Sequence, residues 1–270
     1  MRSHKEGPLS VLRVALLVSL VSSVVVAATA VGLQPMQQEN RRRDREHQLL
    51  AIVGLDNDLL SDEQTSKLFR ERIAPRLVDL ETGDYLATPP GEAGFDPLTW
   101  EGARAAVNPA WSRRLTREED IAGLQRRERY AVVYTLMQGE QVETLILPVR
   151  GYGLWSTLYG FLAIDADLNT VRGLRFYEHK ETPGLGGEVD NPRWQAKWPG
   201  KRVFGEDGAV KLRVGKAGGA GSDENSRWRV DALAGATLTS DGVNAMIRFW
   251  LGPTGYGPYL QTLRQSGSAS

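Results

Sequence analysis

Residues 130–178 read YAVVYTLMQGEQVETLILPVRGYGLWSTLYGFLAIDADLNTVRGLRFYE, and this stretch decides the fold class. It contains four runs rich in β-branched, leucine and aromatic residues, a composition that is typical of strands. Short polar turns separate the first run from the second and the third from the fourth. Because a parallel pair needs a long crossover, these connections predict an antiparallel meander and argue against a doubly wound parallel sheet. The predicted strands are 130–137, 142–149, 159–164 and 171–178.

Two helices are predicted before this sheet. Residues 37–54 read as a charged helix that runs into an apolar turn and ends at Gly54. Ser61 is expected to begin the second helix, because Gln64 follows it at the spacing of a capping box. Pro75 is expected to end that helix, since proline cannot donate a backbone hydrogen bond. Between this helix and the sheet we expect a short strand over 77–80, and a loop with one short helix over 88–115.

A further helix is predicted near the C-terminus. Apolar residues at 243, 246, 247, 250 and 251 recur at helical spacing and give 241–251 one apolar face. Before it, 216–227 reads as a loop of glycine, serine and charged residues, and 228–230 reads as a short strand. Helices that flank an antiparallel sheet in this order predict an α+β fold.

The N-terminal segment is apolar. Residues 14–33 carry no charge, and about 20 such residues are enough to span a bilayer as a helix. The alternative is a cleaved signal peptide, because Ala28-Thr29-Ala30 resembles a cleavage site. We expect a retained transmembrane helix, since the apolar run continues past that site and a polar helix follows. Arginines at 41, 42, 43 and 45 outnumber the basic residues before the span, so the positive-inside rule alone would place the remainder of the chain in the cytoplasm.

The composition excludes several function classes. Lys plus Arg equals Asp plus Glu at 33 each among 270 residues, so there is no electrostatic signature of nucleic-acid binding. The chain has no cysteine, which excludes disulfides and iron–sulfur ligation by its own thiolates. Its three histidines, His4, His47 and His179, argue against a multi-histidine metal site. The segment 151–156 lacks the third glycine of a nicotinamide-binding fingerprint. We therefore expect no metal ligand.

The segment 231–240, DALAGATLTS, carries the chemistry. It lies between a predicted strand and a predicted helix, and its small residues let a ligand approach the backbone closely. The hydroxyls of Thr237, Thr239 and Ser240 cluster where the helix begins, and a helix N-terminus suits a phosphate. The alternative is an ordinary helix cap, because Ser, Thr and Asp are common there.

This segment resembles the flavinylation motif Asp-x-x-Ser/Thr-Gly-Ala-Thr of the FMN-binding domain family. The resemblance implies FMN joined through its phosphate to Thr237 by a separate flavin transferase, with FAD as donor. Asp231, Gly235 and Ala236 match the motif. Ala234 stands where the family has Ser or Thr, which leaves the extent of modification open.

Two further segments resemble the same family. Residues 179–186, HKETPGLG, resemble its turn against the isoalloxazine ring, although a plain hairpin turn is the alternative. Residues 151–160, GYGLWSTLYG, resemble its segment lining the flavin, although Trp and Tyr are often core residues. The residues expected to bind the cofactor are Asp231, Gly235, Ala236, Thr237, Leu238, Thr239, Ser240, Trp155, Ser156, Thr157, Glu181, Thr182, Gly184, Leu185 and Gly186.

Residues 33–54 resemble the juxtamembrane stretch of one subfamily, and together these features resemble the family of C subunits of Na⁺-translocating NADH:quinone reductases. That resemblance implies a one-electron FMN carrier, inactive alone and without a catalytic acid or base, which works with other subunits and membrane lipid in a bacterial inner membrane. It implies a periplasmic flavin domain, in contrast to the charge count. The alternatives are the G subunits of ion-translocating ferredoxin:NAD oxidoreductases and an anchored binding or sensory module. The expected division is a cytoplasmic N-terminus (1–13), a transmembrane helix (14–33), an accessory region (34–125), the FMN-binding domain (126–254) and a tail (255–270).

Overall fold

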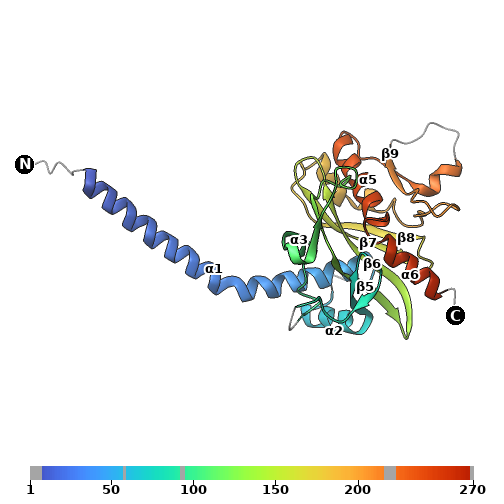
Figure 1. Cartoon of the computed structure of the whole chain (residues 1–270), viewed down its shortest axis with the longest axis horizontal. Coiled ribbons are helices and arrows are strands. Elements are labelled where there is room, and N and C mark those ends of the chain that lie inside the picture. Colours follow the sequence, from blue (N-terminus) through green and yellow to red (C-terminus); the bar gives the residue numbers. More distant parts are fainter. Residues whose placement is uncertain (1–7, 57–58, 92–94, 216–222, 268–270) are drawn as a thin grey trace, which may run out of the picture. The chain divides into compact units, whose positions relative to one another are not determined.

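The computed structural model describes residues 8–56, 59–91, 95–215 and 223–267 (Figure 1). The chain forms two compact units, Met1–Asp44 and Arg45–Ser270. The first consists of most of helix α1 (Pro8–Ile52), and the second contains all the other elements.

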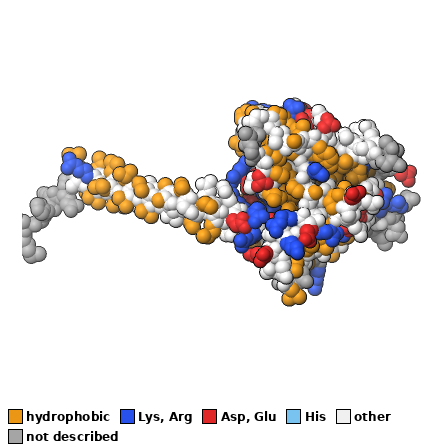
Figure 2. All heavy atoms as spheres, turned by 90° about the horizontal axis from the view of Figure 1, so that it is seen from below, with side chains coloured by type: hydrophobic (Ala, Val, Ile, Leu, Met, Phe, Trp, Pro, Cys, Tyr) orange, Lys and Arg blue, Asp and Glu red, His pale blue; other side chains and the backbone are white. Residues whose placement is uncertain are grey.

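Helix α1 is continuous through the apolar segment and the charged segment that follows it. The expected helix over 37–54 is therefore the continuation of the apolar one, even though Pro35 lies inside it. The most apolar stretch of α1 has a mean hydropathy of 2.5 and none of it is buried, and apolar side chains follow this part of the helix in Figure 2. By length and composition, α1 is long and apolar enough to cross a membrane.

The last turns of α1 belong to the second unit and are buried there. Leu49 and Leu50 are fully buried, and the carboxylate of Glu46 accepts a hydrogen bond of 2.5 Å from the hydroxyl of Ser66. Ser66 lies on α2 (Asp62–Arg72), which begins with the predicted capping box between Ser61 and Gln64.

The expectation that Pro75 ends α2 is wrong. The helix ends at Arg72, and Pro75 lies inside strand β1 (Ile73–Asp79), opposite Tyr134 of the next strand. The other neighbour of β1, strand β2, pairs only with Leu77 and Val78. Pro75 therefore lies where β1 is an edge strand, which is where a sheet tolerates a residue without an N–H donor.

The predicted antiparallel meander is confirmed. One six-stranded sheet has the order β2-β1-β5-β6-β7-β8, and each neighbouring pair is antiparallel. Its four long strands match the four predicted runs, while β1 begins four residues before the expected 77–80. The remaining strands of this sheet are β2 (Tyr85–Leu86), β5 (Tyr130–Gln138), β6 (Gln141–Tyr152), β7 (Thr157–Asp165) and β8 (Val171–Glu178).

The two faces of the sheet bury separate clusters of apolar side chains. Along β5, Val133 belongs to one cluster and its neighbours Val132 and Tyr134 belong to the other, as the alternation of a strand requires. The ends of α1 and α2 contribute Leu50 and Phe69 to the second cluster. The first cluster lies beneath helices α5 (Thr237–Leu251) and α6 (Gly257–Gly267), and it is the one that supports the site.

Three irregular regions contain structure beyond what was expected. The stretch 88–115 contains the one short helix included in the expectation, α3 (Gly102–Val107), and in addition a 3₁₀ turn (Pro109–Trp111) and strand β3 (Ser112–Arg114), which pairs with β4 (Arg126–Glu128). Helix α5 begins at Thr237 rather than at 241. The expected tail contains α6, because Tyr259 and Leu260 bury their side chains in the core.

The remaining elements surround the functional motif. Strand β9 (Arg213–Gly215) pairs in parallel with β10 (Arg229–Asp231), which corresponds to the strand expected over 228–230. Part of the loop expected over 216–227 lies outside the described residues, and its end forms the 3₁₀ helix η3 (Asp223–Trp228). The turn after β8 continues into the 3₁₀ helix η2 (Gly186–Asp190) and the short helix α4 (Pro192–Gln195).

Candidate functional site

The motif segment connects β10 to α5 through a turn of small residues. Gly235 has a φ of +73°, a left-handed conformation that is cheap only for glycine. Thr237 is the first residue of α5, and the preceding Ala236 provides no side-chain cap. The first N–H groups of α5 are therefore not satisfied by a capping side chain, which leaves this helix end suited to an anion.

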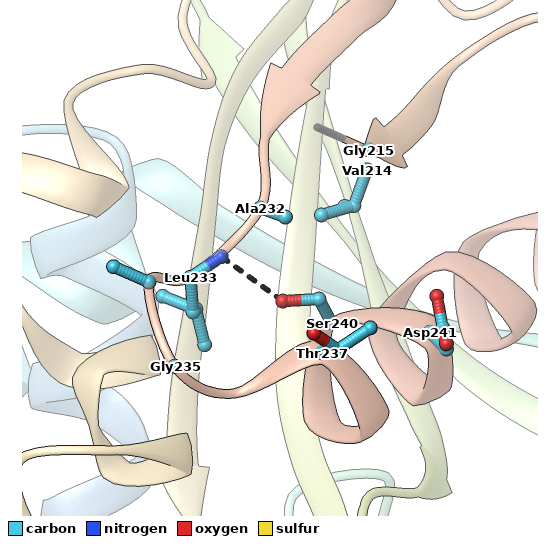
Figure 3. A pocket seen from close by; sticks show the side chains of 9 residues that line it. Val214, Gly215, Ala232, Leu233, Gly235, Thr237, Ser240 and Asp241 are labelled. Carbon is cyan, nitrogen blue, oxygen red and sulfur yellow. Dashed lines mark hydrogen bonds between the residues drawn. The ribbon is translucent and has the colours of Figure 1, made fainter. Parts of the chain in front are cut away.

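The three hydroxyls of the motif have different environments. Thr239 is fully buried, and its Oγ1 donates to Glu181 Oε2 at 2.8 Å. Ser240 is also buried, and its Oγ accepts from the backbone N–H of Leu233 at 3.0 Å, as Figure 3 shows. Thr237 is exposed. Among these hydroxyls, only that of Thr237 is accessible to a reaction partner.

A pocket of about 360 Å³ lies beside Thr237 (Figure 3). Its lining comes from the carboxyl ends of β9 and β10, from the turn, and from the first helical turn of α5 as far as Asp241. The backbone N–H of Val214 donates to Asn244 Oδ1 at 3.1 Å, which holds β9 against α5. Val214 and Gly215 were not among the expected site residues, because nothing local in their sequence shows that β9 would pair beside the motif. The expected set also omitted four lining residues within or next to the motif, which are Ala232, Leu233, Ala234 and Asp241.

Glu181 connects the three segments that the sequence singled out. Its Oε1 accepts from the backbone N–H groups of Leu154, Trp155 and Ser156 at 3.1, 2.9 and 3.2 Å, and its Oε2 accepts from Thr239. The side chain of Glu181 is buried. Burial by itself would raise the pKa of the Glu181 carboxyl, but these four hydrogen bonds to the ionised form outweigh it and lower that pKa.

Glycines allow these segments to approach one another. A Cβ on Gly186 would lie 2.5 Å from Thr239 Oγ1 and 2.6 Å from Glu181 Oε2. A Cβ on Gly153 would lie 2.6 Å from Glu181 Oε1. All three distances are far below ordinary van der Waals contact, so any other residue at either position would displace the carboxylate.

Large apolar side chains are exposed on the same three segments. Trp155 is 66% exposed, Leu185 is 46% exposed and Leu238 is 60% exposed. Leu185 lies next to the motif turn, since its Cδ2 is 3.3 Å from the Cβ position of Gly235. An apolar surface beside an accessible hydroxyl and an uncapped helix end suits a ligand that combines a flat ring with a phosphate, and FMN fits that description.

The other expected residues serve the segments themselves. Asp231 pairs with Lys197 at 3.4 Å, and its carbonyl oxygen accepts from the indole of Trp194 at 2.9 Å. The hydroxyl of Ser156 accepts from the N–H of Lys180 at 2.8 Å. The carbonyl oxygen of Thr182 accepts from Leu185 and Gly187, which closes the turn in which Gly184 has a φ of +75°. Thr157 is half-buried at the start of β7.

The family comparison agrees with the location of this site. A sequence profile of the FMN-binding domain matches residues 153–252, a range that includes Glu181 and the whole motif. Two crystal structures are also similar. NqrC of Shewanella oneidensis has a TM-score of 0.74 and 29% identity, with coverage of 84% of this chain and 99% of that one. The C subunit of the Na⁺-translocating NADH-quinone reductase of Parabacteroides distasonis has a TM-score of 0.63 and 27% identity, with coverage of 84% and 96%.

Relatives with the same description match almost the whole chain. The C subunit of the Na⁺-translocating NADH-quinone reductase of Pseudomonas aeruginosa is 47% identical over 263 residues, which are 97% of this chain and 98% of that protein. The same subunit of Neisseria meningitidis serogroup B is 44% identical over 98% and 97%, and that of Pasteurella multocida is 41% identical over 98% and 97%. This chain therefore belongs to the family of C subunits of Na⁺-translocating NADH-quinone reductases, and it contains that family's FMN-binding domain.

Proposed function

We propose that this chain carries electrons within a membrane-bound, sodium-translocating NADH:ubiquinone oxidoreductase, with FMN attached by a phosphodiester to Thr237. One observation supports the attachment point above the others. Of the three hydroxyls in the motif, only that of Thr237 is exposed, and it lies on the first residue of a helix without a side-chain cap. The positive end of the helix dipole stabilises the phosphate charge there.

The attachment exchanges the phosphoanhydride bond of FAD for a phosphoester bond to the threonine. Thr237 Oγ1 attacks the flavin-side phosphorus of FAD, the P–O bond of the anhydride breaks, and AMP leaves with the bridging oxygen. A threonine hydroxyl needs a base for this reaction. We assign that base, which takes the proton, to a separate flavin transferase. The backbone N–H groups at the start of α5 face the phosphate and hold it once it is bound.

When bound, FMN supplies one-electron redox chemistry, and the protein positions it. The exposed side chains of Trp155, Leu185 and Leu238 are proposed to cover the isoalloxazine ring. The remaining expected contacts stay part of this proposal: they are Asp231, Gly235, Ala236, Thr239, Ser240, Ser156, Thr157, Thr182, Gly184 and Gly186. No side chain of this chain is required to act as acid or base in the electron transfer.

The membrane arrangement is also proposed. Residues 14–33 cross the bacterial inner membrane once, in contact with lipid and with the other subunits of the complex, and the FMN-binding domain (126–254) lies in the periplasm. Strand β1 and helix α6 extend the sheet and core beyond those domain limits. The relatives described above are all C subunits, so neither the ferredoxin-linked G subunit nor a sensory module is favoured.

The absence of cysteine makes the orientation straightforward to test. Lys67→Cys on α2 introduces a single thiol at a side chain that is 71% exposed. A membrane-impermeant maleimide should label it in cells whose outer membrane alone is permeabilised. Labelling only after the inner membrane is broken would place the domain in the cytoplasm.

The covalent bond is tested by co-expressing the chain with a flavin transferase and reading flavin fluorescence on a denaturing gel. The wild-type chain and Thr237→Ser should fluoresce, whereas Thr237→Ala should not. Fluorescence that persists in Thr237→Ala would place the bond on another residue. A wild-type band without fluorescence would reject the covalent attachment.

A further inference from the structure

The carboxylate of Glu181 is buried, and both of its oxygens are hydrogen-bonded within the protein. One oxygen accepts from three consecutive backbone N–H groups, and the other accepts from a buried hydroxyl. Gly153 and Gly186 lie so close to the carboxylate that neither can carry a Cβ without displacing it. Only 5% of the residue is exposed. A flavin that bound beside this loop would meet the segments that Glu181 holds, and not its carboxylate.

We propose that Glu181 is a positioning residue that assembles the FMN site before the flavin arrives, and that it does not contact the flavin. This role rests on the proposed attachment of FMN to Thr237. It differs from the contact role that resemblance alone assigns to Glu181. The carboxylate is the only side chain among the described residues that hydrogen-bonds both the 154–156 segment and the first turn of α5.

The hydrogen bonds of Glu181 show which parts of the site it positions. Three amides that point at one oxygen fix the backbone of residues 154–156, and this leaves the indole of Trp155 exposed. Thr239 lies two residues after Thr237 on the same helical turn, so its bond to Glu181 fixes the start of α5. A single side chain thus sets the apolar surface and the acceptor hydroxyl relative to each other.

The same hydrogen bonds also determine the charge of Glu181. The hydrogen bonds stabilise the ionised carboxylate, so it adds a fixed negative charge to the site at neutral pH. A negative charge near a flavin makes the addition of an electron less favourable. The midpoint potential of bound FMN therefore reports on Glu181 in a way that packing alone would not.

Glu181→Gln separates charge from geometry. The amide oxygen can still accept from the three backbone N–H groups, and the amide nitrogen can donate to Thr239, whose hydroxyl accepts as well as it donates. We expect this variant to keep the covalent FMN and the slow amide exchange of residues 154–156, and to have a higher FMN midpoint potential than the wild type. An unchanged potential would contradict the fixed charge beside the flavin.

Glu181→Ala removes both charge and geometry. In the full chain, made without flavin transferase and solubilised in detergent, amide exchange of residues 154–156 should accelerate by about tenfold or more, the effect of losing one or two hydrogen bonds. Flavin labelling in the presence of the transferase should slow by a similar factor. Exchange and labelling at wild-type rates would overturn the proposal.

Glu188→Ala is the matched control. This carboxylate lies on η2 within the same loop, where it accepts a hydrogen bond from the side chain of Asn191 at 2.6 Å and, among the described residues, forms no hydrogen bond with segment 154–156 or with α5. The Glu188→Ala substitution should leave the amide exchange of residues 154–156 unchanged, and an acceleration equal to that of Glu181→Ala would overturn the proposal.

Folding of the Glu181→Ala variant is checked separately. Unchanged exchange of the β5–β6 amides shows that this variant has folded. If it does not fold, Thr239→Val takes its place, because that substitution removes only the hydrogen bond between Glu181 and α5. Because exchange is read without flavin, it tests Glu181 even if Thr237 proves not to be modified.

Discussion

Two regions of the site, two residues apart on one helical turn, have opposite properties. The acceptor segment 234–238 exposes the side chains of Thr237 and Leu238. The supporting contact between Glu181 and Thr239 is buried, fully hydrogen-bonded and enclosed by glycines. The difference shows that this protein separates reactivity from stability. The group to be modified is left accessible, and the group beside it holds the surrounding segments together. Substitutions in the two regions should therefore have different signatures.

Gly186→Ala should give the largest loss of stability. The new Cβ would lie within 2.6 Å of both Glu181 Oε2 and Thr239 Oγ1, so it both overpacks the loop and breaks their hydrogen bond. We expect the free energy of unfolding to fall by about 3 kcal/mol, measured by thermal unfolding in detergent. Gly215→Ala is the control, because no heavy atom lies within 4 Å of its Cβ position. Equal losses in the two variants would remove the distinction between the regions.

Thr239→Val should give the next largest loss of stability. It keeps the shape of the side chain but leaves one carboxylate oxygen of Glu181 without its hydroxyl donor, at a cost of about 1–2 kcal/mol. Thr237→Val should change stability by less than about 0.5 kcal/mol, because that side chain is exposed. Flavin labelling should show the reverse order, with complete loss in Thr237→Val and only slower labelling in Thr239→Val. A larger loss of stability in Thr237→Val would refute the comparison.

Trp155→Ala should affect only the loaded protein. The side chain is 66% exposed, so the apo protein should unfold within about 0.5 kcal/mol of the wild type. If the indole packs on the isoalloxazine ring, the stabilisation that FMN adds should fall by about 0.5–1.5 kcal/mol. Apo and loaded forms are compared by thermal unfolding, with Trp155→Phe expected to retain most of the difference. Destabilisation of the apo form instead would assign Trp155 to the fold.

Ala234→Ser should have the smallest effect, confined to the rate of modification. It restores the hydroxyl that the family motif has at this exposed position. A hydrogen bond that forms only during transfer would accelerate labelling by up to about tenfold, with stability unchanged. The time course of in-gel fluorescence measures this rate, and Ala234→Gly controls for the change in side-chain size. Labelling no faster than in the wild type would show that a hydroxyl at this position does not assist the transfer.

Patterns local in sequence predicted much of the fold. The four strand runs were recognised because β-branched and aromatic residues alternate or cluster over strand lengths, and 171–178 matches β8 residue for residue. The cap at Ser61 was predicted because both of its hydrogen bonds lie within four residues. Pro75 was misinterpreted, because only the arrangement of neighbouring strands makes it tolerable in β1. Helix α6 was missed, because its buried residues acquire partners only from the distant sheet.

For the site, the sequence determined which residues are chemically capable, and the tertiary structure decided which of them are available. The motif places three hydroxyls at the start of a helix, and their local pattern does not distinguish them; only the resemblance to the family motif assigns Thr237. Burial of Thr239 and Ser240 leaves Thr237 as the accessible one, and burial depends on packing between distant segments. The partners of Glu181 lie 25 to 58 residues away along the chain, so no local pattern specifies them. Hydrogen bonds over such separations form only when the sheet brings the segments together, which is why the connecting role of Glu181 is visible in the structure and not in the sequence.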